Sequence, residues 1–317
     1  MTDTQNEAFK TPANKIRLFE HGAPGSQNLK LTRKYYTEDM PDGRVKHIVQ
    51  NITDPDIVPY IPDGIGSSTD RQRIPAVLII PGGAFRRLVY NFEGEDVAKW
   101  LNSMGIAAFV LECRLPSDEH DNAEDVPLID AMRAMRVIRG RAQEFGIDEA
   151  KIGVMGFSAG GFMAALLSTA YESDVYADYK YKDEYDKLSA RPDFAVCSYP
   201  VISIDDCIEA GKRYMSEEQV LERISDGKAK ILHKYNPDKL VRPDMPPVFI
   251  CETDDDRTTL SENSVGFYMA ARKAGVSAEL HIFRTGGHGY GCGDDFAQTG
   301  EWKVLFTKWI KSIGIIS

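Results

Sequence analysis

Short apolar runs alternate with amphipathic stretches through most of this chain. From residue 74 onward, runs of four to six apolar residues recur, each bounded by glycine, proline or polar residues. Such runs are typical of strands that are buried on both faces. We expect strands at 76–80, 106–111, 152–155, 194–199, 247–252 and 278–283.

Between these runs, the apolar residues recur at helical spacing. In one stretch, Val97, Leu101 and Met104 share a face, and Gly105 marks the helix end. Pro127 suits the first turn of a longer helix, and Gly146 suits its end. The predicted helices cover residues 94–104, 127–145, 159–171, 261–274 and 301–313.

The part before residue 74 is polar and rich in turns, and 29–36 and 45–52 are predicted as antiparallel strands. The alternation that follows indicates an α/β fold, in which helices flank a mostly parallel central sheet. We expect a single domain over residues 1–317. Two insertions, 172–190 and 203–235, lie between predicted strands. They are either a small cap or lid over the strand ends or ordinary surface excursions.

Composition excludes several classes of protein. The net charge of −10 opposes binding to a nucleic-acid backbone, which needs a concentrated basic patch. No run approaches the roughly 18 apolar residues of a membrane span, and the first residues do not have the pattern of a signal peptide. The five cysteines are scattered without C-x-x-C spacing, so we expect reduced thiols, a cytoplasmic location and no zinc site.

The motif G-F-S-A-G, residues 156–160, lies between a predicted strand and a predicted helix. A sharp turn there would hold Ser158 outward at the strand end. A serine hydroxyl is a weak nucleophile, and it needs a base and an acid that orients the base. Without such partners, the motif would be only a tight structural turn.

Candidate partners follow later strands. In open α/β sheets, ligands bind at the carboxyl ends of the strands. An aspartate run follows 247–252, and His288 follows 278–283 in a glycine-flanked loop. His281 lies inside a predicted strand, and the other histidines precede the serine or lie in 203–235, so His288 is the preferred base. Asp256, deepest in its loop, is the preferred acid and Asp255 the alternative. The order serine, aspartate, histidine is that of the α/β-hydrolase triad.

An oxyanion formed at the serine would need preorganised N–H donors. Ala159 lies at a predicted helix N-terminus, where amides point outward. The Pro-Gly-Gly-Ala-Phe turn after the first parallel strand lets the backbone approach closely, and Gly83 and Ala84 are the candidate donors there. The alternative is a simple turn from strand to loop.

The chain resembles the esterase/lipase branch of the α/β-hydrolase superfamily, in particular the acetyl-esterase and acetylxylan-esterase-like proteins called xylanase-like or BD-FAE-like. The resemblance covers nearly the whole chain. Its motifs are GAPG (22–25), PGGAF (81–85), RLP (114–116), DAMRAMRVIRGRAQEFGID (130–148), KIGVMGFSAGG (151–161), RPDFAVCSYPVIS (191–203), PPVFICETDDD (246–256), ENS (262–264) and ELHIFRTGGHGYG (279–291).

The resemblance also concerns individual residues. It selects Asp256 as the acid, three residues before the place of the family's Val-Pro, which here is Thr259-Leu260. Ala84 replaces the last glycine of the family's oxyanion turn. Phe162 replaces a family histidine and would make the acyl pocket more apolar. Phe85, Phe162 and Tyr199 are the expected substrate contacts.

We therefore predict a serine carboxylesterase that hydrolyses short-chain acyl esters, chiefly acetyl esters, through an acyl-enzyme. Neither a metal nor an organic cofactor is required, and the expected partner is a small-molecule ester. The family suggests acetylated sugars, while aryl, feruloyl and lactone substrates are alternatives. An amidase or peptidase on the same fold, and a non-catalytic ligand-binding protein, are the rival functions.

Overall fold

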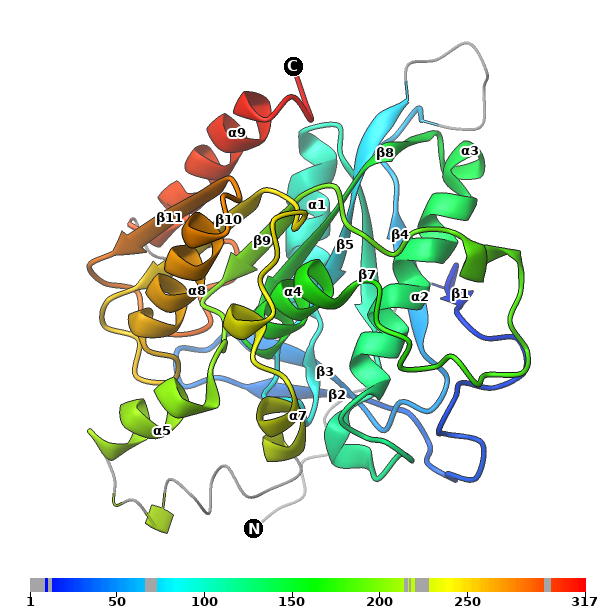
Figure 1. The fold of residues 1–317 in the computed structure, drawn as a ribbon, viewed down its shortest axis with the longest axis horizontal. Helices are drawn as coiled ribbons and strands as arrows, with labels where there is room; N and C mark the ends of the chain where they lie inside the picture. Colours follow the sequence, from blue (N-terminus) through cyan, green and yellow to red (C-terminus); the bar gives the residue numbers. More distant parts are fainter. Residues whose placement is uncertain are drawn as a thin grey trace.

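An eight-stranded sheet with helices on both faces forms the centre of the computed structural model (Figure 1). The structure describes residues 9–10, 13–65, 73–213, 216, 218–219, 228–293 and 298–317. The strand order is β1-β4-β7-β5-β8-β9-β10-β11. The bounds are β1 Ile16–Arg17, β4 Asp56–Tyr60, β5 Ile74–Ile80, β7 Ala107–Glu112, β8 Ile147–Phe157, β9 Ala195–Ser198, β10 Val248–Thr253 and β11 Ala278–Phe283.

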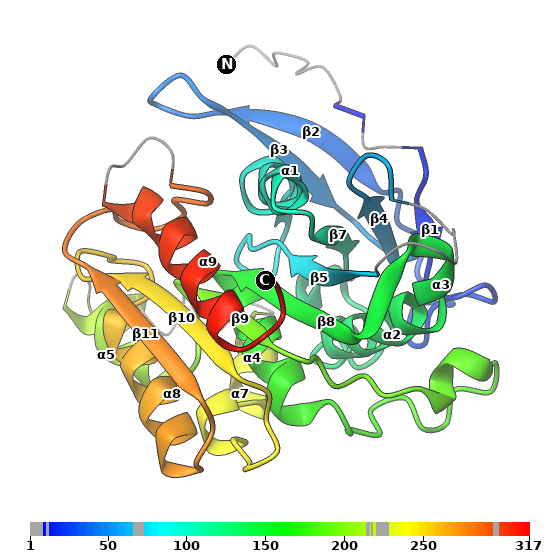
Figure 2. The same cartoon turned by 90° about the horizontal axis from the view of Figure 1, so that it is seen from above.

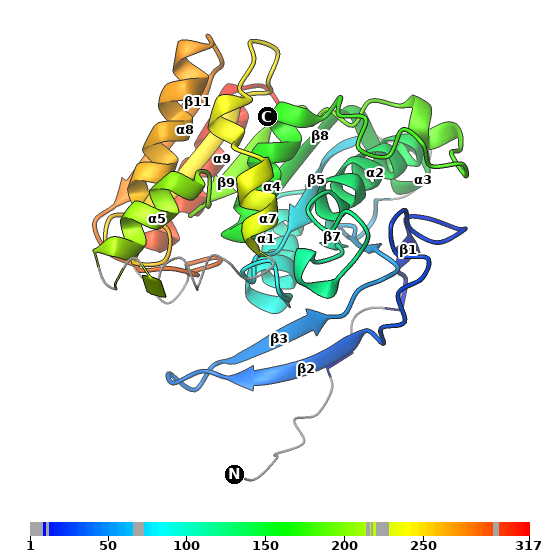
Figure 3. The ribbon, with the colours of Figure 1, turned by 60° about the horizontal axis from the view of Figure 1, so that its bottom comes forward.

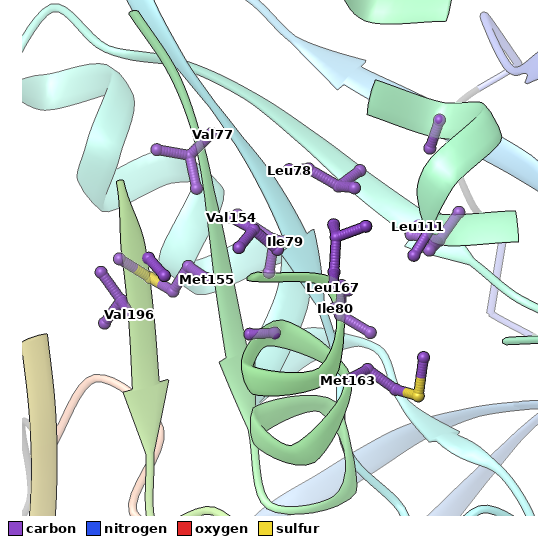
Figure 4. Close-up of a cluster of buried hydrophobic side chains, with 14 of the residues drawn as sticks. Val77, Leu78, Ile79, Ile80, Leu111, Val154, Met155, Met163, Leu167 and Val196 are labelled. Carbon is purple, nitrogen blue, oxygen red and sulfur yellow. The ribbon is translucent and has the colours of Figure 1, made fainter. Parts of the chain in front are cut away.

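The strands from β7 to β11 along this order are mutually parallel, whereas β4 pairs antiparallel with both β7 and β1. The predicted mostly parallel sheet is therefore confirmed. Strands β7, β9 and β10 are buried along their whole length, which explains their unbroken apolar sequences. Figure 4 shows the side chains of β5, β8 and β9 packed with Met163 and Leu167.

Two groups of helices cover the sheet, and Figure 2 shows α1 and α9 on one face and α2, α4 and α8 on the other. Trp100 of α1 stacks edge-on against Trp302 of α9 at 4.9 Å. The bounds are α1 Asp96–Ser103, α2 Val126–Gly140, α3 Ala142–Phe145, α4 Ala159–Ala170, α8 Ser261–Lys273 and α9 Trp302–Ser312. In the described part of the chain, no helix has the length and apolar content of a bilayer span.

The single helix predicted over 127–145 is interrupted at Arg141, which has φ −104° and ψ 16° and separates α2 from α3. Gly140 precedes the break. The ring of Tyr185 lies so close to it that a Cβ there would be 2.4 Å from Tyr185 Cδ1. The prediction of one helix was wrong, and the break directly follows a glycine, a residue of low helix propensity.

The N-terminal part forms a separate three-stranded antiparallel sheet from β2 (Lys34–Asp39), β3 (Val45–Gln50) and β6 (Leu88–Val89). The hairpin expected from the sequence is confirmed, although its first strand begins later than predicted. Figure 3 shows this hairpin extending below the main body. Because β3 pairs with β6, the hairpin is attached to the chain just after the Pro-Gly-Gly-Ala-Phe turn.

The segment 172–190 lies along α2. Asp183 and Asp186 both pair with Arg133 of that helix, and the hydroxyl of Tyr179 donates to the carbonyl of Gly22 at 2.9 Å. The segment contains the short 3-10 helix η3 (Glu184–Lys187). These contacts attach it to the flank of the domain, and its role as a cap stays a prediction.

The segment 203–235 contains α5 (Ile204–Lys212) and α7 (Lys228–Lys234), and part of it lies outside the described residues. Helix α7 contacts the 3-10 turn η2 (Pro116–Asp118), which follows the carboxyl end of β7. Lys234 pairs with Asp125 at 2.7 Å at the start of α2. A position near the strand ends is compatible with a cap, and that role also stays a prediction.

Candidate active site

Ser158 occupies a strained turn between β8 and α4. Its φ of 54° and ψ of −117° are a conformation that non-glycine residues rarely adopt. The flanking glycines permit it: a Cβ on Gly156 would lie 1.9 Å from the carbonyl oxygen of Gly160, and one on Gly160 would lie 1.9 Å from that of Ile80. The turn therefore requires glycine at both places.

His288 joins the serine to an acid. Its Nε2 lies 2.8 Å from Ser158 Oγ, and its Nδ1 lies 2.6 Å from Asp256 Oδ2. The imidazole comes from the loop after β11, and its side chain is 21% exposed, while that of Asp256 is 0% exposed. If Nδ1 donates to the carboxylate, Nε2 is left to accept the serine proton. The imidazole is thus partly exposed to solvent, whereas the Asp256 carboxyl is buried.

Asp256 is held by several donors. Its Oδ1 accepts from the amides of Thr258 at 2.7 Å and Thr259 at 3.0 Å, and its Oδ2 accepts from the Thr259 hydroxyl at 2.9 Å. Burial alone would raise the pKa of Asp256. The hydrogen bond and charge of His288, together with the two amides, outweigh burial and lower this pKa below its usual value. The carboxylate is therefore maintained beside the imidazole.

Asp255, the alternative acid, has a different position. Its Oδ1 accepts from the amides of Gly286 and Gly287 at 2.9 and 2.8 Å. These contacts fix the loop that carries His288. The structure thus brings Asp256 to the imidazole, while Asp255 supports the loop backbone.

The Pro-Gly-Gly-Ala-Phe turn lies against the serine. A Cβ on Gly82 would be 2.9 Å from Ser158 Cβ, so only glycine permits this approach. Gly83 and Ala84 have φ of 138° and 58°. Within the described residues, nothing accepts a hydrogen bond from the amides of Gly83 or Ala84. Ala159, the first residue of α4, follows the serine directly. Gly82 thus brings the turn that contains Gly83 and Ala84 against the serine, and donation to an oxyanion by the three amides stays a prediction.

The three predicted substrate contacts, Phe85, Phe162 and Tyr199, are all buried. Phe85 is 6% exposed, and it stacks edge-on against the fully buried Phe162 at 5.5 Å. Tyr199 is also fully buried, and its ring faces the imidazole of His288 at 5.0 Å. Direct contact of these residues with a substrate stays a prediction.

Two polar residues near the serine, Glu93 and Thr259, were not identified as site residues from the sequence. Glu93 is buried and accepts from the amide of Gly82 at 2.8 Å and from the hydroxyl of Tyr199 at 2.9 Å. Thr259 donates its hydroxyl to Asp256. In the sequence, Glu93 is only an acidic residue in the short segment between the predicted strand 76–80 and the predicted helix 94–104. No local pattern therefore distinguishes it.

Arg114 forms a buried ion pair. Its guanidinium and Asp130 are both 0% exposed and pair at 2.7 Å. The arginine of the Arg-Leu-Pro motif is thus part of a buried ion pair. Among the described residues, no cluster of histidine, cysteine, aspartate and glutamate has the arrangement of a metal site.

Comparisons with known proteins identify a family and several relatives of this chain. Residues 65–270 match the model of the BD-FAE family. An acetylxylan esterase from Xylanibacter ruminicola is 31% identical over 240 residues, which are 75% of this chain and 45% of that protein. This chain thus spans less than half the length of the curated relatives it matches.

Solved structures extend the similarity to the whole fold. An acetyl ester-xyloside bifunctional hydrolase from Caldicellulosiruptor lactoaceticus is 35% identical, with a TM-score of 0.71, over 96% of this chain and 97% of that one. A thermophilic esterase from Thermogutta terrifontis, with butyrate bound, is 25% identical, with a TM-score of 0.65, over 83% of this chain and 91% of that one.

Proposed function

The chain belongs to the BD-FAE family and has the α/β-hydrolase fold, and from this premise we propose that it is a serine carboxylesterase for short-chain, chiefly acetyl, esters. The observation that carries the proposal is the position of His288, 2.8 Å from Ser158 Oγ and 2.6 Å from Asp256 Oδ2. This arrangement suits the activation of a serine hydroxyl.

In the proposed acylation step, Ser158 Oγ attacks the ester carbonyl while His288 Nε2 takes its proton. Asp256 holds the imidazole and stabilises the imidazolium. The carbonyl oxygen becomes an oxyanion, which accepts hydrogen bonds from the amides of Gly83, Ala84 and Ala159. His288 then protonates the leaving alcohol as the tetrahedral intermediate collapses to the acyl-enzyme.

In the proposed deacylation step, water replaces the alcohol. His288 takes a proton from that water, and the resulting hydroxide adds to the acyl carbonyl. The second intermediate collapses, Ser158 regains its proton from His288, and the carboxylic acid leaves. Each step uses only the side chains and amides named above, together with the ester and water, so the proposed mechanism needs no cofactor.

The names of two relatives support a short acyl group. One is an acetylxylan esterase, and the other is an acetyl ester-xyloside bifunctional hydrolase. We therefore propose acetylated sugars as the substrate class.

A cytoplasmic location is also part of the proposal. Cys113, Cys197 and Cys251 are buried free thiols, which suits a reducing compartment. In that compartment, short acetylated oligosaccharides or small metabolites are more accessible substrates than intact polymer.

The proposal is tested by hydrolysis of p-nitrophenyl esters from acetate to octanoate. We expect turnover to be highest with acetate and to disappear in Ser158→Ala. The matched control is Ser168→Ala, which removes a buried hydroxyl from the same helix and leaves the site intact. Ser158-dependent cleavage of acetyl p-nitroanilide but not of the esters would indicate the amidase alternative. Absence of turnover on both series would favour a binding protein.

A further inference from the structure

Glu93 is a buried carboxyl that the proposed steps do not use. It lies in the π-helical turn η1 (Asn91–Glu95), and it is 5% exposed. Burial raises the pKa of Glu93, although the nearby His288 opposes this effect. No lysine or arginine of the described residues forms an ion pair with it. Burying a carboxyl costs free energy unless hydrogen bonds compensate for the lost water. Glu93 accepts two such hydrogen bonds.

The first hydrogen bond is to the Pro-Gly-Gly-Ala-Phe turn, residues 81–85, which we call the oxyanion turn after its proposed role. Glu93 Oε2 accepts from the amide of Gly82 at 2.8 Å. A Cβ on Gly82 would lie 2.8 Å from this oxygen and 2.9 Å from Ser158 Cβ, so the carboxyl and the serine both border the same glycine. Because the Gly82 amide points to Glu93, the next amides, of Gly83 and Ala84, are the ones left for an oxyanion.

The second hydrogen bond extends to the loop of His288. Glu93 Oε1 accepts from the Tyr199 hydroxyl at 2.9 Å, and that hydroxyl accepts from the amide of Gly291 at 3.1 Å. The carbonyl of Gly291 accepts from Trp302 Nε1 at 3.0 Å. The ring of Tyr199 also faces His288. One carboxyl thus connects the oxyanion turn with the loop that carries the base.

We infer that Glu93 is a positioning residue, which holds the Gly82 amide and, through Tyr199, fixes the oxyanion turn relative to the loop of His288. The inference rests on the proposed esterase function. Glu93 accepts hydrogen bonds from the Gly82 amide and from the Tyr199 hydroxyl. These bonds affect the transition state, because the donors for the oxyanion must be in place before charge develops. Small displacements of such groups cost as much as about a hundredfold in rate.

Steady-state kinetics of Glu93→Ala, Glu93→Gln and Tyr199→Phe on p-nitrophenyl acetate test this inference. We expect Glu93→Ala to lower kcat by about fiftyfold or more with KM within about threefold. Glu93→Gln keeps an oxygen for the Gly82 amide, so we expect kcat within about tenfold of the wild type. Tyr199→Phe breaks only the second connection, and we expect an intermediate loss of kcat.

Glu95→Gln is the matched control, because Glu95 lies in the same turn and pairs with Lys99 at the surface. Circular dichroism establishes that each variant is folded. A folded Glu93→Ala with unchanged kcat, a loss expressed in KM alone, or an equal loss in Glu93→Gln would each overturn the inference. If Glu93→Ala does not fold, an unchanged kcat in Tyr199→Phe overturns it. Failure of the proposed function is distinguishable, since the wild type itself would then lack Ser158-dependent hydrolysis.

Discussion

The hydroxyl of Thr259 lies 2.9 Å from Oδ2 of Asp256, the same oxygen that lies 2.6 Å from His288 Nδ1. The family resemblance implies valine at this position in related proteins, and valine has no such donor. In this chain, two side-chain donors therefore share one carboxylate oxygen. The hydroxyl favours the ionised form of a carboxyl that is otherwise buried.

Thr259→Val removes this hydroxyl with little change of shape. We expect kcat/KM to fall by roughly threefold to tenfold, the effect of one hydrogen bond to a buried polar group. Without the donor, the ionised carboxyl loses one of its hydrogen bonds, so we expect the acid limb of the pH profile of kcat/KM to move to higher pH. The measurement is kcat/KM from pH 4 to 9, with exposed Thr258→Val as the control. An unchanged profile would show that the hydroxyl has no influence on the pair.

The two neighbouring aspartates give a second prediction. Asp256→Asn keeps the size of the side chain but places an uncharged amide against His288, and we expect kcat to fall by roughly 10³- to 10⁴-fold. Asp255→Asn keeps an oxygen that can accept from Gly286 and Gly287, so we expect a loss of less than about fivefold. The reverse order of the two effects, measured on p-nitrophenyl acetate, would assign the acid to Asp255.

The sequence predicted β7, β9 and β10 well because strands buried on both faces have largely apolar runs. It did not predict β4, which is short and contains Pro59, a residue that weakens any strand prediction. It also joined α2 and α3, because the only local signal for a break there is Gly140, and an isolated glycine is tolerated within a helix. Local patterns are thus sufficient where burial is uniform and fail where a strand is short or a helix break has only a weak signal.

The same distinction holds at the candidate site. The order and strand-end positions of Ser158, Asp256 and His288 were sufficient to choose residues that the structure brings within hydrogen-bond distance. The choice between Asp255 and Asp256 depended on family resemblance, because adjacent residues of one loop have no distinguishing local pattern. Glu93 could not be assigned, since both of its hydrogen bonds join segments that are separate in the sequence.

The oxyanion turn gives a third prediction, in two opposite substitutions. A Cβ on Gly83 would lie 2.1 Å from the carbonyl oxygen of Arg87, and its φ of 138° is unfavourable for any other residue. We expect Gly83→Ala to displace the turn and lower kcat about a hundredfold or more. Ala84→Gly relieves a left-handed conformation at φ 58° and keeps the amide.

In Ala84→Gly, the relief of backbone strain stabilises the folded chain by about 1 kcal/mol. The greater entropy of the unfolded chain lowers the free energy of unfolding by about the same amount. We therefore expect a free energy of unfolding within about 1 kcal/mol of the wild type, and kcat within about threefold. Urea unfolding and steady-state kinetics measure both. A severe loss in Ala84→Gly together with a normal Gly83→Ala would contradict this account of the turn.

Glu252 gives the last prediction, on stability. It is 0% exposed, at the end of β10, and its oxygens accept from the amide of Thr253 at 2.9 Å and the hydroxyl of Ser264 at 3.3 Å. Burial, and then the charge of Asp256, raise the pKa of Glu252 well above its usual 4.5. The folded chain therefore binds this proton more tightly than the unfolded chain does.

A raised pKa stabilises the fold fully below the unfolded value of 4.5, and this contribution is lost as pH rises toward the folded pKa. Glu252→Gln has no such proton. Its free energy of unfolding, relative to the wild type, should therefore increase with pH above about 4.5, by at most about 1.4 kcal/mol per pH unit. Urea unfolding at pH 5, 6, 7 and 8 measures this difference, with the exposed Glu149→Gln as the control. A difference that does not change with pH would mean that Glu252 has the same proton affinity in the folded and unfolded chains, and that its burial has no energetic consequence near Asp256.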